Sequence, residues 1–262
     1  MMPYLETKLG KINYKIKRKK NSPFIVFIGG LGSNISSRED QMKYFSKYFS
    51  VLIFDNLGSG KSNKPDTDYS MEMFASNCNE IMELLKIPSA HIIGNSMGGM
   101  IAQVFASKFP KKVNKLILAC TCSTRDKISK EIISISKKIV NNVGLKEIWF
   151  NALLLGYSRD YVERNFMNYK KAKVSNNQNE IEGYLNQCKA IESLNNTNYL
   201  KKIKAKTLII FGKNDLIVPP KKSMSMAKYI KNSEVIGFPG GHGFWKEYQD
   251  IVNKEVIDFL AD

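Results

Sequence analysis

A serine between two glycines sits where the chain passes from a strand-like apolar run to a helix-like segment. Ser96 stands in Gly94-Asn95-Ser96-Met97-Gly98. A serine at such a junction lies on a sharp turn, which requires small flanking residues and exposes the hydroxyl group. The five-residue pattern alone is common, but its position between strand and helix predicts that Ser96 is a nucleophile.

A serine hydroxyl group needs a general base, and the chain contains two histidines. His242 lies in a glycine-rich loop, residues 240–243, after the last strand-like segment, and we predict that it is the base. His91 opens the strand that leads to Ser96. At ~3.3 Å per residue, five positions place it at the far end of that strand, so we expect it to be structural.

An acid is needed to hold the imidazole tautomer and to stabilise the imidazolium. Asp215 follows the strand-like run 207–211, at the rim of the sheet where open α/β folds place their sites. We predict this role for Asp215, although it could instead cap a helix that begins near Pro219. Asp126 is the reserve candidate.

Two backbone N–H groups are required to stabilise an oxyanion. The amide of Met97, next to the nucleophile, is one candidate. The amide of Leu31, in the loop Gly29-Gly30-Leu31-Gly32 after an apolar run, is the other. The loop could also be no more than a tight turn.

The segments around these residues alternate between strand-like and helix-like patterns. Continuous apolar runs predict strands buried on both faces of a sheet, and alternation over 11–17 predicts a half-buried strand. The expected strands are 11–17, 24–28, 51–54, 91–93, 115–119, 207–211 and 234–238. The expected helices are 37–48, 71–85, 97–109, 220–230 and 246–260. This order predicts an α/β fold with a mostly parallel sheet flanked by helices.

The alternation is interrupted between about residues 121 and 202. This interval holds amphipathic, Asn- and Lys-rich helical material such as 132–140 and 145–155, without a strand-like run. We interpret it as a helical cap inserted after the fourth parallel strand. The expected division is therefore 1–122 for the first part of the core, 123–202 for the cap and 203–262 for the second part of the core.

Composition and charge narrow the class of protein. With 43% hydrophobic residues the chain has material for a sizeable core, and it lacks an apolar run of the ~20 residues that a membrane span needs. The N-terminus does not resemble a signal peptide, so we expect a cytoplasmic protein. The net charge is 40 − 24 = +16, but the lysines are scattered. Scattering favours a solvated surface over a specific nucleic-acid or membrane partner, although such a chain attracts anions at low salt.

Four cysteines without a C-x-x-C motif, together with two histidines, offer few metal ligands. We expect buried free thiols, no metal and no organic cofactor.

The order Ser96, Asp215, His242, preceded by a glycine-rich loop and interrupted by a helical block, resembles the α/β-hydrolase superfamily over essentially the entire chain. The segment 55–62, DNLGSGKS, is similar to the D-x-R-G-x-G-x-S loop of its lactonase and esterase branches. It departs at Leu57, where the family usually has Arg, and Gly29 stands where the family more often has His. The resemblance implies a serine hydrolase that cleaves carboxylic esters or lactones through an acyl-enzyme on Ser96.

Other activities of this superfamily stay open. The nucleophile segment is also similar to that of carbon–carbon bond hydrolases of ring-cleavage products, whose oxyanion loop, however, typically continues with Pro-Gly. Acyl transfer to another acceptor and ligand binding without catalysis are further alternatives. Members with an aspartate nucleophile are disfavoured by Ser96. We expect the substrate to be a small ester or lactone. The sequence specifies neither the particular compound nor the oligomeric state.

Substrate selectivity is expected to reside in apolar side chains of the cap. These are Trp149, Phe150, Leu153 and Tyr157, with Leu154, Leu155 and Phe166 as further candidates. They could instead pack the cap against the core.

Overall fold

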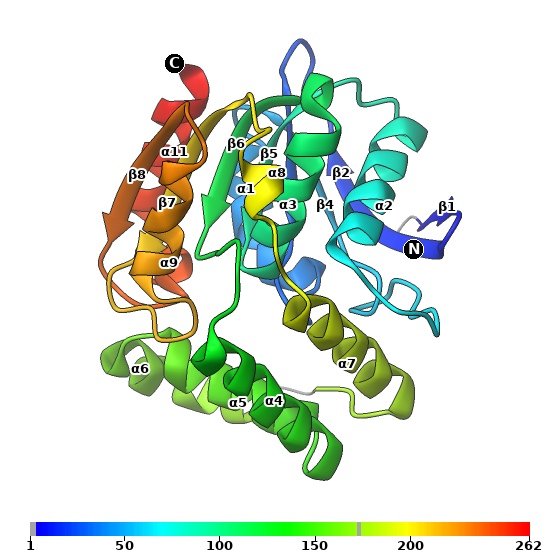
Figure 1. Ribbon diagram of the computed structural model, residues 1–262, viewed down its shortest axis with the longest axis vertical. Coiled ribbons are helices and arrows are strands. Elements are labelled where there is room, and N and C mark those ends of the chain that lie inside the picture. The colour runs from blue at the N-terminus through cyan, green and yellow to red at the C-terminus, as the bar shows by residue number, and fades with distance from the viewer. Residues whose placement is uncertain (1–3, 172–173) are drawn as a thin grey trace.

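An eight-stranded sheet runs through the computed structural model, which describes residues 4–171 and 174–262 (Figure 1). The order across the sheet is β1-β2-β4-β3-β5-β6-β7-β8. The strands from β3 to β8 are parallel to one another, and β1 and β2 join one edge in antiparallel pairing. Their bounds are β1 Tyr4–Thr7, β2 Gly10–Lys17, β3 Phe24–Ile28, β4 Ser50–Phe54, β5 Ala90–Asn95, β6 Val113–Ala119, β7 Lys206–Gly212 and β8 Ser233–Phe238. The predicted fold, a mostly parallel sheet flanked by helices, is confirmed.

Both faces of the parallel strands are buried, which explains their continuous apolar sequences. In β3, Val26 and Ile28 belong to an apolar cluster shared with helices α2 and α3, while Ile25 and Phe27 belong to a second cluster shared with α1 and α11. Successive side chains of a strand point to opposite faces, so each face receives its own core. The helices around the sheet are α1 Glu39–Phe45, α2 Met71–Leu84, α3 Met97–Lys108, α8 Thr197–Leu200, α9 Pro220–Ser225, α10 Phe244–Glu247 and α11 Gln249–Ala261, with 3₁₀ turns η1 Ile35–Arg38, η2 Pro110–Lys112 and η3 Met226–Lys228.

Four helices occupy the interval between β6 and β7. They are α4 Lys127–Asn142, α5 Leu145–Gly156, α6 Arg159–Lys171 and α7 Gln178–Glu192. In Figure 1, α4, α5 and α6 lie beyond the end of the sheet toward which the arrowheads of β6 and β8 point. The carboxyl ends of the parallel strands therefore face this group of helices. The exact division of the chain into core and cap at residues 123 and 202 stays a prediction.

Several elements differ from the sequence expectations. The edge strand β1 was not expected, because it has four residues and alternates between exposed and half-buried positions. The predicted helix 37–48 is a 3₁₀ turn followed by α1, which ends at Phe45. The predicted helix 246–260 begins earlier and is divided into α10 and α11 at Tyr248, whose φ of −121° and ψ of 40° are not helical. Sequence periodicity does not detect such single-residue breaks.

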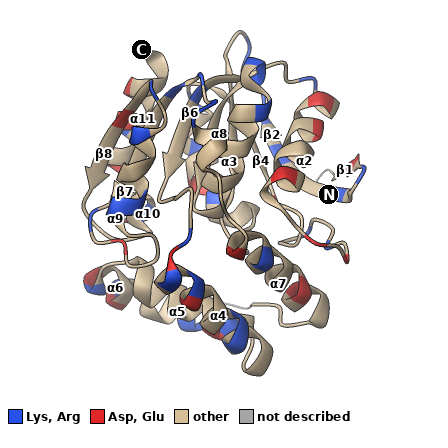
Figure 2. Ribbon diagram, viewed as in Figure 1, with Lys and Arg blue, Asp and Glu red and all other residues tan. Residues whose placement is uncertain are grey.

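Lys and Arg residues are distributed over many elements in the ribbon of Figure 2, and Asp and Glu residues lie among them. The four cysteines, Cys78, Cys120, Cys122 and Cys188, are free and buried, as predicted. Within the described residues, none of the helices has the length and apolar character that a membrane crossing requires.

Candidate active site

Ser96 occupies a strained turn between β5 and α3. Its φ of 55° and ψ of −122° are unusual for a residue with a side chain, and such backbone conformations cost on the order of 1–3 kcal/mol. The flanking glycines permit the turn. A Cβ atom on Gly98 would collide with the carbonyl oxygen of Ile28 and lie 2.6 Å from that of Gly29, and one on Gly94 would lie 2.7 Å from Cβ of Ala102. The predicted steric need for both glycines is confirmed.

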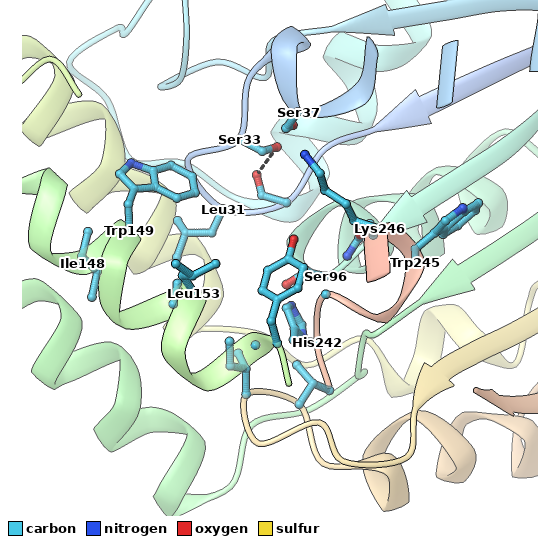
Figure 3. A pocket seen from close by; sticks show the side chains of 18 of the residues that line it. Leu31, Ser33, Ser37, Ser96, Ile148, Trp149, Leu153, His242, Trp245 and Lys246 are labelled. Carbon is cyan, nitrogen blue, oxygen red and sulfur yellow. Dashed lines mark hydrogen bonds between the residues drawn. The ribbon is translucent and has the colours of Figure 1, made fainter. Parts of the chain in front are cut away.

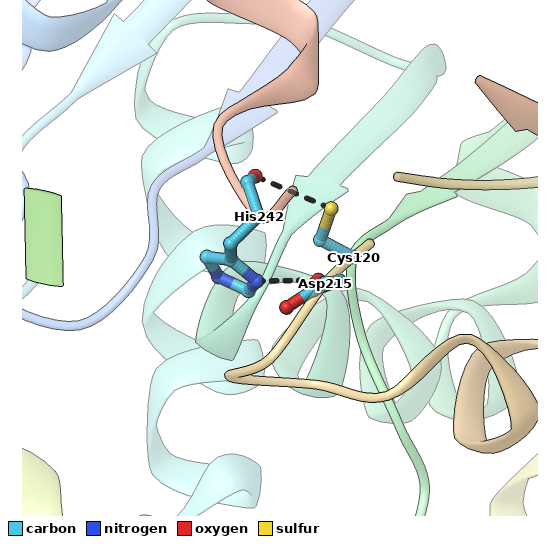
Figure 4. Close-up of side chains that lie close together, drawn as sticks. All are labelled: Cys120, Asp215 and His242. Carbon is cyan, nitrogen blue, oxygen red and sulfur yellow. Dashed lines mark hydrogen bonds and ion pairs between the residues drawn. The ribbon is translucent and has the colours of Figure 1, made fainter. Parts of the chain in front are cut away.

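His242 and Asp215 are hydrogen-bonded, with 2.7 Å between Nδ1 and Oδ2 (Figure 4). The other carboxylate oxygen, Oδ1, accepts hydrogen bonds from the amides of Ile217 and Val218 at 2.9 and 2.8 Å. These bonds fix a carboxylate whose side chain is fully buried. Because an ionised carboxylate only accepts hydrogen bonds, the imidazole carries its proton on Nδ1, which leaves the lone pair of Nε2 free to accept another.

Cys120 lies beside this pair and was missed by sequence reasoning. It directly follows β6 with a φ of 47°, and its thiol donates to the carbonyl oxygen of His242 at 3.3 Å. Burial, and after it the charge of Asp215, raises the pKa of the thiol well above its ordinary value. The ligand atoms of Cys120, Asp215 and His242 lie within 4.8 Å of one another, so this is a group that could hold a metal ion. Any cation there would compete with the hydrogen bonds already made by Asp215.

The loop that contains Leu31 lies against Ser96. A Cβ atom on Gly30 would lie 3.3 Å from Cβ of Ser96, and Leu31 lines the same cavity as Ser96. The carbonyl of Gly29 accepts from Nδ2 of Asn56 at 2.9 Å, and that of Gly30 accepts from the amide of Ser33 at 3.2 Å. These bonds hold the loop in place.

The amides of Leu31 and Met97 take part in none of the hydrogen bonds found between described residues. Met97 is the first residue of α3, where an amide has no partner inside the helix. Neither N–H group is thus engaged by an acceptor among the described residues, and Leu31 lines the cavity.

A cavity of about 410 Å³ opens between the carboxyl ends of the strands and the helices between β6 and β7. Ser96 and His242 both line it, and Figure 3 shows them close together at its floor, with Ile148, Trp149 and Leu153 on the side formed by α5. A small molecule bound here would meet the serine hydroxyl group and the imidazole together.

Three of the four predicted pocket residues line this cavity: Trp149, Leu153 and Tyr157. Tyr157 lies against Gly243, and burial raises its pKa to about 12, so the phenol is uncharged at neutral pH. Phe150 differs from these three residues in its position. Its ring packs against Phe166 at 5.8 Å, and it is not among the lining residues, because adjacent positions of a helix face different directions.

The further candidates Leu154, Leu155 and Phe166 also lie outside the lining and are exposed.

Two polar residues of the cavity region had no recognisable sequence signal. Arg38, half-buried in η1, donates from Nη2 to Oδ1 of Asn95 at 2.7 Å. Gln187 of α7 is fully buried; its Oε1 accepts from the amide of Gly32 and its Nε2 donates to the carbonyl of Leu57, both at 2.7 Å. Gln187 therefore ties α7 to two loops of the sheet. Neither contact follows a periodic pattern, since the partners are 57 to 155 residues apart.

The remaining polar residues that the sequence analysis named do not line the cavity, and their contacts stabilise local structure. His91 is buried at the start of β5 against Phe49, with ring centroids 5.8 Å apart, and does not line the cavity. Asp126 caps α4 through the amide of Ser129 at 2.8 Å. Asp55 accepts from the amides of Ile35 at 2.6 Å and Lys61 at 2.8 Å, which organises its own loop.

Comparison with known proteins agrees with this architecture. The family model described as alpha/beta hydrolase fold matches residues 23–143. The chain is 25% identical to 3-oxoadipate enol-lactonase 2 of Acinetobacter baylyi, over 88% of this chain and 86% of that protein.

Among solved structures, the enol-lactonase from Burkholderia xenovorans LB400 superposes with a TM-score of 0.92 at 26% identity, covering 99% of this chain and all of that one. An esterase from Exiguobacterium antarcticum has the same fold, with a TM-score of 0.86 at 22% identity over the full length of both chains. The chain has the α/β-hydrolase fold, and these similarities support a place in that superfamily.

Proposed function

We propose that this protein is a serine hydrolase that cleaves carboxylic esters or lactones, with Ser96 as nucleophile, His242 as general base and Asp215 as the acid that orients the base. The observation that carries the proposal is the shared cavity: the serine on its strained turn lines it together with an imidazole whose Nδ1 is held by a buried carboxylate. The names of the enol-lactonases from Acinetobacter baylyi and Burkholderia xenovorans support a lactone or a related ester as the substrate class.

The proposed cycle begins when Oγ of Ser96 attacks the ester carbonyl and passes its proton to Nε2 of His242. The tetrahedral intermediate carries an oxyanion, which the amides of Leu31 and Met97 stabilise. The imidazolium then protonates the leaving alkoxide, and an acyl group remains on Ser96. Water, deprotonated by the same histidine, attacks the acyl group and releases the acid. In a lactone the leaving oxygen is part of the acyl chain itself, so the second step releases a single ring-opened acid.

Labelling with a fluorophosphonate probe tests the nucleophile directly. We expect covalent modification of Ser96 in the wild-type protein, located by peptide mapping, and none in Ser96→Ala. Hydrolysis of short p-nitrophenyl esters should be lost in the same variant. Ser33→Ala is a matched control, because Ser33 lines the cavity but its hydroxyl donates to the carbonyl of Gly30 at 3.0 Å. Labelling at another residue, or equal hydrolysis by Ser96→Ala, would refute the proposal.

A further inference from the structure

The cavity at Ser96 is lined by positive but not by negative side chains. Its described lining residues include Arg38, Arg125 and Lys246, and contain neither Asp nor Glu. Asp215 lies behind His242 and does not line the cavity. The formally charged side chains that a small molecule meets inside are therefore positive, which favours anions over cationic compounds.

Two of these cations, Arg38 and Arg125, each have an Nε atom that is buried without a partner. The one hydrogen bond of Arg38 to a described residue goes to the neutral amide oxygen of Asn95. Arg38 forms no ion pair within the described chain; the carboxylate of its neighbour Glu39 is bound by Lys15 instead. Partial burial of a cation without an anionic partner is unfavourable, and a bound carboxylate would reduce that cost.

The other two cations are less suited to this role. Lys246 is exposed, and Figure 3 shows it on the side of the cavity where Ser33 and Ser37 lie. Arg125 donates from Nη2 to the carbonyl oxygen of Ser129 at 2.5 Å, so its guanidinium group is held at the start of α4. A solvated ammonium group attracts an additional anion less than a partly buried guanidinium group does. Of the two guanidinium groups, that of Arg38 is bonded to the residue before Ser96, whereas that of Arg125 is bonded to α4.

The position of Arg38 relates it to the proposed chemistry. Its partner Asn95 is the residue before Ser96, and Arg38 and Ser96 line the same cavity. Apolar side chains from α4 and α5, among them Ile133, Ile148 and Leu153, line another part of the cavity. The cavity thus combines a cationic region and an apolar region around one hydroxyl group.

We propose that Arg38 forms a carboxylate-binding subsite, so that the preferred esters or lactones carry a free acid group besides the bond that is cleaved. The planar guanidinium matches a carboxylate with two parallel hydrogen bonds. This inference rests on the proposed serine hydrolysis for its kinetic test, but not for its binding test.

The kinetic test uses two pairs of esters that differ in one carboxylate. The p-nitrophenyl monoester of glutaric acid is compared with p-nitrophenyl pentanoate, and 4-acetoxybenzoate with p-tolyl acetate, which places the charge on the acyl side or on the leaving group. In at least one pair we expect the wild-type kcat/KM to favour the anionic ester by about tenfold or more. Arg38→Gln should lower this ratio about tenfold, and Arg38→Lys, which keeps the charge, should lower it less.

Arg159→Gln is the control for general attraction by the basic surface. It removes the same charge, but the Arg159 side chain is 89% exposed and lies outside the cavity. We expect its ratio to stay unchanged. Comparing ratios between variants cancels the intrinsic reactivity of each ester and any general effect of a variant on Ser96. Equal ratios in wild type and Arg38→Gln for both pairs would overturn the subsite while leaving the proposed hydrolysis intact.

A titration with glutarate, followed by calorimetry, separates binding from catalysis. Ser96→Ala should bind glutarate, and Ser96→Ala with Arg38→Gln should bind it about tenfold more weakly or not at all. If the wild-type protein cleaves none of the four esters, the hydrolase proposal fails, and the glutarate titration still decides the subsite. Absence of glutarate binding to Ser96→Ala, or binding that is indifferent to Arg38, would overturn the inference.

Discussion

Asp215 holds His242 with one carboxylate oxygen and is itself held by the other, which accepts two backbone N–H groups. The carboxylate therefore has no rotational freedom with which to follow a moving imidazole. In the proposed mechanism Asp215 is an orienting group, so we expect its effect to appear in turnover more than in substrate affinity.

Replacing Asp215 with asparagine tests this role. The amide would accept the two backbone bonds, but its NH₂ group would face Nδ1 and favour the wrong imidazole tautomer. We expect kcat on a p-nitrophenyl ester to fall about 10³- to 10⁴-fold, with a folded protein by circular dichroism. Asp126→Asn is the matched control, because its carboxylate caps α4 and pairs with Lys222. Comparable losses in both variants would contradict the assignment.

The close approach of α3 to β3 gives a prediction about stability. A methyl group at Gly98 would press on two backbone carbonyl groups that cannot easily shift, so Gly98→Ala should lower the free energy of unfolding by about 2–3 kcal/mol in urea titrations. At Gly156 the nearest atom would be 3.5 Å away, an ordinary contact. We expect Gly156→Ala to be neutral or slightly stabilising, and equal losses in the two variants would be inconsistent with this packing.

Selectivity for the length of the acyl chain should depend on those residues of α5 that line the cavity. Leu153→Ala removes a buried lining side chain and should move the optimum of a p-nitrophenyl ester series toward longer acyl chains by about two carbons or more, since the variant enlarges the apolar region. Phe150→Ala, outside the lining, should leave the optimum where it is in the wild type. The comparison is made with kcat/KM values, and a shift in Phe150→Ala alone would refute the lining.

Because His91 is buried, we predict that the free energy of unfolding depends on pH. Burial, with a smaller effect of Lys115, lowers its pKa from 6.5 to about 4. Because the unfolded chain binds a proton between these pH values and the folded chain does not, the folded state loses stability as the pH falls from above 6.5 toward 4.

Between pH 7 and pH 5 this effect amounts to about 2 kcal/mol. We expect the drop in unfolding free energy over this range, measured with urea, to be smaller by that amount in His91→Gln than in the wild type. Identical pH dependence in both proteins would show that His91 keeps its ordinary pKa when folded.

The sequence predicted those parts of the fold and site that depend on local patterns. The run Phe24–Ile28 identifies a strand buried on both faces, and the glycines around Ser96 identify the turn, because each constraint acts within a few residues. The bond between Arg38 and Asn95 and the position of Cys120 depend on strand order, which local periodicity does not specify. Phe150 and Leu153 are both large apolar residues of one predicted helix, so the sequence did not distinguish their roles. The orientation of α5 relative to the sheet determines which of them lines the cavity.

The parallel order of the sheet affects how the protein would acquire activity during refolding. Leu31 follows β3, Ser96 follows β5, Asp215 follows β7 and His242 follows β8, so the proposed residues meet only after strands far apart in sequence have paired. Long-range pairing of this kind is slow, because the entropy of closing each chain loop is lost before the contacts form. Recovery of ester turnover after dilution from denaturant would therefore report on the last assembly of the sheet, later than the return of helical signal.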